Sequence, residues 1–137
     1  MHNCEAELRA FVSSEGLQGS VHFAGDVRNV HEYLQASDIF VFPTESDAFP
    51  LALVEAMACG LPVVVSNVAS LPEVVGDAGL LVDPHDVDEL TVAMWRILKD
   101  DDLRREMREK GLRQAARFSW ERAARETLEI YRRVSEK

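Results

Sequence analysis

Two carboxylates, Asp47 and Glu55, stand in the run "DAFPLALVEAMACGLPVVVS" between Asp47 and Ser66. Pro50 suits the first turn of a helix, where its missing N–H is not needed, and Gly60 suits the end of that helix. Asp47 would then lie just before the helix. Glu55 would lie roughly 7–8 Å along the axis from Pro50, at about 1.5 Å per residue. Its sequence neighbours are apolar, and a carboxylate buried among them would need a partner.

This spacing fits the chemistry of a nucleotide sugar. The start of a helix presents free N–H groups and the positive end of the helix dipole, which together bind phosphate. One carboxylate would bind hydroxyls of a sugar, the other would bind the ribose diol, and the amides between them would hold a diphosphate. Simpler interpretations stay open, because Asp47 could be an ordinary acid at a helix start and Glu55 could lie at the edge of an apolar face.

The elements that position these residues follow an alternating pattern. The continuous apolar runs "DIFVFP", "LPVVVS" and "GLLVD" are typical of buried parallel strands. A further short strand is predicted in "SVHFAG", which ends at Gly25. Strands that alternate with helices predict an α/β fold with a parallel sheet and helices on both faces, and ligands in such folds bind beyond the carboxyl ends of the strands. The predicted helices span residues 5–14, 30–34, 50–59 and 103–116, and others start at Ser70, Asp86 and Ser119.

Some of these helices allow more detailed predictions. The sequence "SLPE" at Ser70 resembles a capping box, in which the serine side chain would bond to the start of its own helix. The charged stretch 99–110 predicts a solvated helix, and Trp95 and Trp120 are interpreted as packing residues.

Composition limits the classes of partner. The 137 residues are enough for one domain, with 47% hydrophobic and 28% charged residues and a net charge of −9. That charge disfavours binding to nucleic acid or to an anionic membrane surface. The apolar runs are far shorter than the roughly 20 residues of a membrane helix. Cys4 and Cys59 lack metal-ligand spacing and are expected to be free thiols, which favours a cytoplasmic location.

The run "ASDIFVFPTESDAFPLALVEAMACGLPVVVSNVASLPEVV" (36–75) resembles the signature region of the family 4 retaining glycosyltransferases. These enzymes have the GT-B fold of two Rossmann-like domains, and their signature contains two glutamates separated by seven residues. The segments "VHFAGDV", "GLLVDPHDVDEL" and "RFSWERAA" also resemble the family, so the similarity covers nearly the whole chain.

The resemblance implies a role for each matching residue. The second glutamate of the family falls on Glu55 and binds the ribose of the nucleotide. The first falls on Asp47, whose side chain is one methylene shorter, and the glycine that follows it is replaced by Ala48. These two carboxylates are the predicted catalytic pair. The remaining predicted donor-binding residues are Phe49, Pro50 and Leu51 beside the diphosphate and sugar, and Gly25, Asp26 and Val27 in the turn that lines the base pocket.

By the same resemblance, residues 1–137 are expected to be one partial domain, the distal part of the C-terminal donor-binding domain. The first two strand–helix units, with an Arg and a Lys that neutralise the diphosphate, and the N-terminal acceptor domain are not in the sequence. The expected partners are a nucleotide sugar and the missing domain or a partner chain. In the usual strand order 3-2-1-4-5-6 the segment at Val21 would lose its neighbours, so that it either repacks on the remaining sheet or needs a partner in the gap.

The implied activity is transfer of a sugar from a nucleotide-diphosphate sugar with retention of anomeric configuration, without a metal or another cofactor. The isolated 137 residues are expected to be inactive. Two alternatives stay open: a non-catalytic nucleotide-sugar-binding or assembly module, and a sugar-nucleotide epimerase of the same fold. The epimerase would need acid–base residues that the sequence does not offer.

Overall fold

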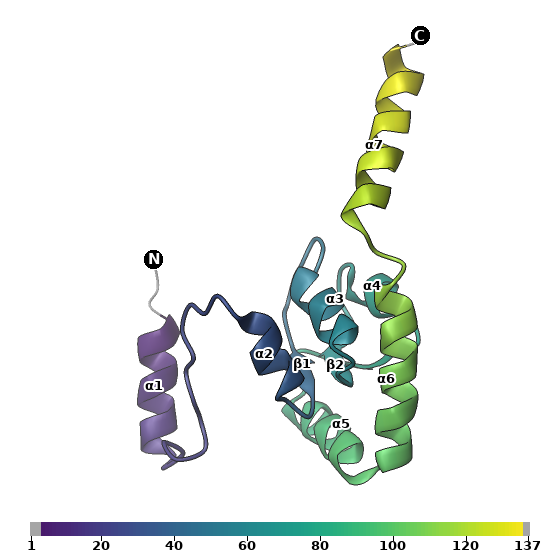
Figure 1. The fold of residues 1–137 in the computed structure, drawn as a ribbon. Coiled ribbons are helices and arrows are strands. Elements are labelled where there is room, and N and C mark those ends of the chain that lie inside the picture. Colours follow the sequence, from purple (N-terminus) through teal and green to yellow (C-terminus); the bar gives the residue numbers. More distant parts are fainter. Residues whose placement is uncertain (1–3, 136–137) are drawn as a thin grey trace.

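A computed structural model describes residues 4–135. Its centre is a three-stranded parallel sheet in the order β1-β2-β3 (Figure 1), formed by β1 (Phe40–Phe42), β2 (Val63–Ser66) and β3 (Gly79–Val82). The middle strand pairs on both sides, with Val41 opposite Val64 and Val64 opposite Leu80. The three apolar runs therefore form the predicted buried strands, and the α/β fold with a Rossmann-like parallel sheet is confirmed.

Side chains of β2 alternate between two packed faces, because successive residues of a strand point to opposite sides. Val63 and Val65 belong to the apolar cluster formed with α3 (Leu51–Ala58) and α4 (Leu71–Val75). Val64 belongs to the cluster formed with α5 (Val87–Lys99) and α6 (Asp101–Ala115). Helices thus cover both faces of the sheet, as predicted.

Helix α6 differs from its prediction, because one side of it is buried. Its Met107, Gly111, Gln114 and Ala115 are buried, and the helix packs along α3. The buried side-chain amide of Gln114 donates a hydrogen bond to the carbonyl of Val74 in α4, at 2.9 Å. The charged residues that dominate the sequence of α6 occupy its other faces, where most of them are exposed, as predicted for a solvated helix. The buried side was not predicted.

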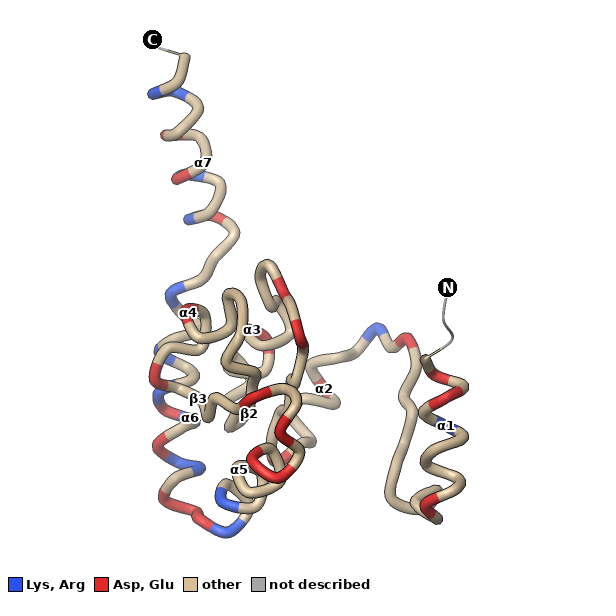
Figure 2. The backbone as a smooth tube through the Cα atoms, turned by 180° about the vertical axis from the view of Figure 1, so that it is seen from behind, with Lys and Arg blue, Asp and Glu red and all other residues tan. Residues whose placement is uncertain are grey.

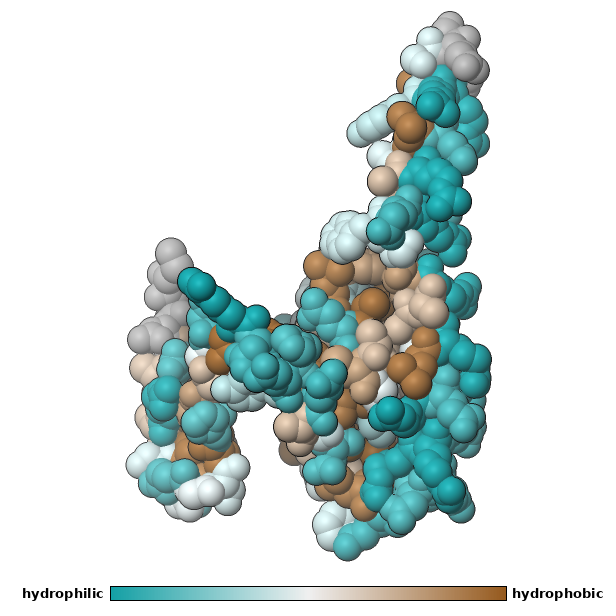
Figure 3. All heavy atoms as spheres, viewed as in Figure 1, coloured by the Kyte–Doolittle hydropathy of each residue, from teal (hydrophilic) through white to brown (hydrophobic). Residues whose placement is uncertain are grey.

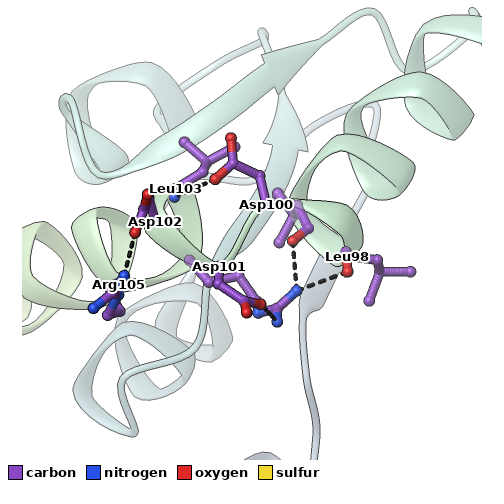
Figure 4. A network of polar contacts seen from close by, with 8 residues as sticks. Leu98, Asp100, Asp101, Asp102, Leu103 and Arg105 are labelled. Atoms are coloured by element: carbon purple, nitrogen blue, oxygen red, sulfur yellow. Dashed lines mark hydrogen bonds and ion pairs between the residues drawn. The ribbon is translucent and has the colours of Figure 1, made fainter.

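The junction of α5 and α6 is closed by polar contacts (Figure 4). The carboxylate of Asp100 accepts the N–H of Leu103 at 2.9 Å and caps the start of α6. The guanidinium of Arg104 reaches back and donates to the carbonyl oxygens of Ile97 and Leu98, at 2.9 and 2.8 Å. These bonds satisfy the last carbonyls of α5, which otherwise lack partners inside the helix.

Helix α1 (Cys4–Ser14) and the segment after it form an arm that stands apart from the sheet (Figure 1), with open space between arm and body in Figure 3. The strand predicted at 20–25 is wrong: these residues form no strand, and the arm is held together by contacts such as Arg9 over the ring of Phe23 at 4.4 Å. A strand is stable only when a neighbour accepts its N–H groups. Within residues 4–135 β1 pairs only with β2, so this segment did not repack on the sheet.

The arm joins the body through α2 (Val30–Gln35), which packs against α3. At the other end of the chain, α7 (Trp120–Ser135) projects from the body (Figure 1) and has no buried residue. Trp120 and Trp95 are 76% and 61% exposed, so their interpretation as packing residues was wrong. No helix in the described part of the chain has the length and apolar content needed to cross a membrane.

The start of β3 allows a test of this packing. A Cβ atom at Gly79 would lie 2.6 Å from a methyl carbon of Val75 and 2.7 Å from one of Val63, closer than real contacts allow. We expect Gly79→Ala to lower the free energy of unfolding by about 1–3 kcal/mol, because the extra methyl overpacks a closed core. The measurement is chemical denaturation followed by circular dichroism.

Gly19→Ala is the matched control, since nothing lies within 4 Å of a Cβ atom placed there. It should change the free energy of unfolding by less than about 0.5 kcal/mol. Equal effects of the two substitutions would contradict the packing described for β3.

Candidate functional site

The connection between β1 and α3 (residues 43–50) leaves the carboxyl end of the sheet. The hydroxyl of Thr44 donates to the carbonyl of Ser46 at 3.0 Å and accepts its N–H at 3.3 Å, which closes the first turn. The connection ends at Pro50, which is buried and whose carbonyl accepts the N–H groups of Leu53 and Val54. Pro50 is therefore the N-cap of α3, one residue before the helix itself.

The start of α3 presents unused hydrogen-bond donors. Within residues 4–135, the backbone N–H groups of Ala48, Phe49 and Ala52 have no acceptor, whereas the N–H of Leu51 donates to the carbonyl of Phe49 at 3.0 Å. Free amides at the positive end of a helix are suited to an anion such as phosphate. Four of the predicted donor-binding residues, Ala48, Phe49, Pro50 and Leu51, thus lie together at one helix start.

Asp47 is held by a residue from the next connection along the sheet. It is half-buried, and its backbone carbonyl accepts the hydroxyl of Ser70 at 2.9 Å. The capping box predicted at Ser70 is wrong, because its side chain makes no bond to the start of α4. The preceding residue, Ala69, has a φ of +50°, a conformation that costs a non-glycine residue about 1–2 kcal/mol.

Glu55 lies on the outer side of α3. Its helix neighbours Leu53, Ala56 and Met57 are fully buried, whereas Glu55 is exposed. The rotation of the helix therefore turns the carboxylate away from its apolar neighbours, so it needs no partner inside the protein. Within the described residues its side chain takes part in no hydrogen bond or ion pair, so both oxygens are available to a ligand.

The predicted base-binding turn, residues 25–27, lies in the arm. Gly25 has a φ of +68°, which explains the need for glycine, and Asp26 is exposed beside it, followed by the half-buried Val27. No hydrogen bond or ion pair in residues 4–135 joins this turn to the connection 43–50. The structure thus brings together the residues 47–51 and leaves the turn 25–27 on a separate segment.

A hollow of about 630 Å³ opens beside the site, between α3, α4 and the start of α7. Phe49 forms part of its wall and meets Phe118 edge to face, with ring centroids 5.7 Å apart. Ser70 and Arg117 also line it. Ser70, Arg117 and Phe118 were not among the predicted site residues. Arg117 and Phe118 nevertheless lie in the "RFSWERAA" segment, which resembles the family.

Charge is unevenly distributed around the site (Figure 2). The sequence from Asn29 to Trp95 contains no Lys or Arg, although it includes all three strands and both predicted catalytic carboxylates. Figure 2 shows Asp and Glu along the connection 43–50, and Lys and Arg gathered on α6 and α7. Residues 4–135 contain no group of three or more acidic, His or Cys side chains suited to a metal ion.

Sequence comparison places this site in a known family. Residues 3–114 match the sequence model of the group 1 glycosyl transferases. The chain belongs to this family. One relative, O-antigen chain mannosyltransferase B of Escherichia coli, is 48% identical over 97 residues, which cover 71% of this chain and 26% of that protein. D-inositol 3-phosphate glycosyltransferase of Nocardioides sp. is 36% identical over 136 residues, which cover 94% of this chain and 30% of that protein.

Solved structures share this fold. Sucrose-phosphate synthase from Thermosynechococcus elongatus superposes with a TM-score of 0.88 at 32% identity, covering 96% of this chain and 34% of that one. Anabaena Alr3699/HepE, solved in complex with UDP, superposes with a TM-score of 0.82 at 23% identity over 96% of this chain and 36% of that one, which shows a shared fold. The chain spans about a quarter to a third of the length of these proteins.

The conformation of Ala69 gives a testable prediction for this site. Replacing an alanine by glycine costs stability through the greater freedom of the unfolded chain, but at Ala69 it also removes the strain of a positive φ. Ala116, which is exposed with a φ of −63°, has no such strain to lose. We expect Ala69→Gly to be more stable than Ala116→Gly by about 1–2 kcal/mol, measured by chemical denaturation. Equal stability of the two variants would show that Ala69 is not strained.

Proposed function

We propose that this chain is the distal part of the donor-binding domain of a retaining glycosyltransferase. The enzyme would transfer a hexosyl group from a nucleotide-diphosphate sugar to an acceptor hydroxyl. The observation that carries the proposal is the layout at the start of α3. There, the free amides of Ala48 and Phe49 lie between two carboxylate residues, Asp47 before the helix and the exposed Glu55 within it.

Each part of that layout matches one part of the donor. The amides and the positive end of α3 would bind the diphosphate, Asp47 would accept hydrogen bonds from the sugar hydroxyls, and Glu55 would accept those of the ribose diol. The turn of Gly25, Asp26 and Val27 would line the base. Membership of the group 1 family supports this assignment, as does the UDP named for one structure of the same fold.

Catalysis in this proposal rests on position and charge. The bond between the anomeric carbon and the diphosphate oxygen breaks, and the acceptor oxygen attacks from the same face. The proton of the acceptor hydroxyl passes to the departing phosphate oxygen. Asp47 would fix the sugar ring, and the amides at the start of α3 would stabilise the charge that develops on the leaving group. We assign the role of general base to none of the described side chains, and we propose no metal or other cofactor.

The acceptor and the remaining cationic groups would come from elsewhere in the protein. A diphosphate carries about two negative charges, and one helix start supplies only about half a positive charge. These two relatives are about three times as long as this chain, which leaves room for a further domain. We therefore propose that other residues of the whole protein complete the charge neutralisation and bind the acceptor.

Glu55→Gln should weaken binding of both the nucleotide sugar and the bare nucleoside diphosphate. Loss of a hydrogen-bond acceptor with a full charge costs about 1.5–3 kcal/mol, which is about a ten- to hundredfold loss of affinity. Titration calorimetry with UDP, GDP and their glucose and mannose conjugates gives the measurement. Glu109→Gln, at an exposed position of α6, is the control with the same change of charge. Unchanged affinity in Glu55→Gln would exclude the ribose assignment.

Asp47→Asn should discriminate between these ligands. If Asp47 binds the sugar, its loss should weaken the nucleotide sugar about tenfold or more and leave the nucleoside diphosphate within about twofold. Asp88→Asn, an exposed acid in the first turn of α5, controls for the change of charge near a helix start. Equal losses for both ligands would mean that Asp47 does not mark the sugar end of the site.

A further inference from the structure

The hydrogen bond from Ser70 to Asp47 connects two loops that are far apart in the sequence. The serine hydroxyl donates to the backbone carbonyl of Asp47 at 2.9 Å, across 23 positions of the chain. Within residues 4–135, no other hydrogen bond reaches residues 44–49 from outside their own connection and α3. Glu45 and Phe49 also contact residues outside this loop, with Glu45 4.0 Å from His85 and the ring of Phe49 against that of Phe118. At Asp47 itself, the hydroxyl of Ser70 provides the one hydrogen bond to the neighbouring connection within the described residues.

The local backbone is arranged for this bond and not for a helix cap. Ser70 has φ −85° and ψ −10°, a helical conformation, whereas a capping residue is usually extended. Ala69 immediately before it has a φ of +50°, which only a surrounding structure can maintain in a non-glycine residue. The hydroxyl is thereby directed away from α4 and toward the connection that carries Asp47.

The two carboxylates of the site differ in how their backbones are held. Glu55 lies in the middle of α3, where the regular bonds of the helix and the burial of Ala56 and Met57 fix it. Asp47 lies in a loop, and its short side chain has few rotatable bonds, so its carboxylate follows its backbone closely. A change at Ser70 should therefore displace Asp47. Phe49 keeps its own contacts with Leu51 and Phe118, and Glu55 stays in place in the helix.

We propose that Ser70 is a positioning residue that holds Asp47 at the sugar end of the donor site. This inference rests on the proposed function. Ser70 acts through the Asp47 carbonyl and fixes the direction of its carboxylate. It is not required to touch the donor itself. Its contribution is specific to the sugar, because the ribose end depends on Glu55 and on the helix.

The test is a double-substitution cycle with Ser70→Ala and Asp47→Asn. Binding is measured by calorimetry with GDP-mannose and UDP-glucose, and with GDP and UDP alone. We expect Ser70→Ala to weaken the nucleotide sugar about two- to tenfold and the nucleoside diphosphate less than about twofold. In the Asp47→Asn background, Ser70→Ala should cause no further loss, because residues that act through one another are not additive.

Two further variants control for folding. Ser37→Ala removes a similar hydroxyl-to-carbonyl bond, to Tyr33 at 2.7 Å, at the end of α2, and should leave both affinities unchanged. Ser70→Cys keeps the volume of the side chain with a much weaker donor and should give the same selective loss as Ser70→Ala. Circular dichroism then verifies that each variant is folded.

The outcomes separate this inference from the proposed function. All four ligands are titrated into the whole protein, which contains the residues that complete the charge neutralisation. Failure of that unsubstituted protein to bind any of the four ligands would overturn both. Binding by that protein, with Ser70→Ala equal to it, would overturn only the role of Ser70. A loss that is equal for sugar and nucleoside ligands, or that adds fully to the loss from Asp47→Asn, would show that the bond only stabilises the loop.

Discussion

The parallel pairing of β2 with both of its neighbours is the constraint on which the other features depend. Val63, Val64 and Val65 are fully buried, which requires a strand on each side and helices on both faces. In a parallel sheet the carboxyl ends of all strands meet at one edge. The connections after β1 and β2 therefore lie next to each other, and the Ser70–Asp47 bond follows from that neighbourhood.

The packing of α3 then decides which of its residues face outward. Leu53, Ala56 and Met57 are buried, and α6 approaches this side closely because it has Gly111 opposite Met57. Once these residues are enclosed, the 3.6-residue period of the helix leaves Glu55 on the outside. Glu55, the one acid in an apolar stretch of sequence, is thus exposed in the folded chain, and its carboxylate oxygens are free.

The strands could be predicted because a buried strand needs apolar side chains on both faces, and that requirement is visible in the runs that became β1, β2 and β3. The segment at Val21 shows the limit of such patterns. It has a strand-like sequence, but a strand also needs a neighbour, and β1 pairs only with β2 within residues 4–135. The same limit applies to Ser70, whose spacing to Glu73 fits a capping box, although the hydroxyl bonds to a loop 23 residues away. The start of α3 could be located from Pro50 alone. The contact of the preceding connection with the loop that carries Ser70 could not be predicted.

The distribution of charge suggests how recognition would be divided under the proposed function. From Asn29 to Trp95 the chain contains no Lys or Arg, so the connection 43–50 and α3 offer a diphosphate amides and no cation of their own. Two cations from outside that stretch, Arg117 and Arg122, line the adjacent hollow. All nucleotide-diphosphate sugars carry the same diphosphate charge, which cations neutralise. They differ in the sugar and the base, which hydrogen bonds from neutral groups and carboxylates recognise. A site built in this way would take its selectivity for the sugar from Asp47 and for the base from the turn 25–27, because the ribose diol at Glu55 is common to UDP and GDP. Most of its affinity for the diphosphate would come from residues outside the stretch 29–95.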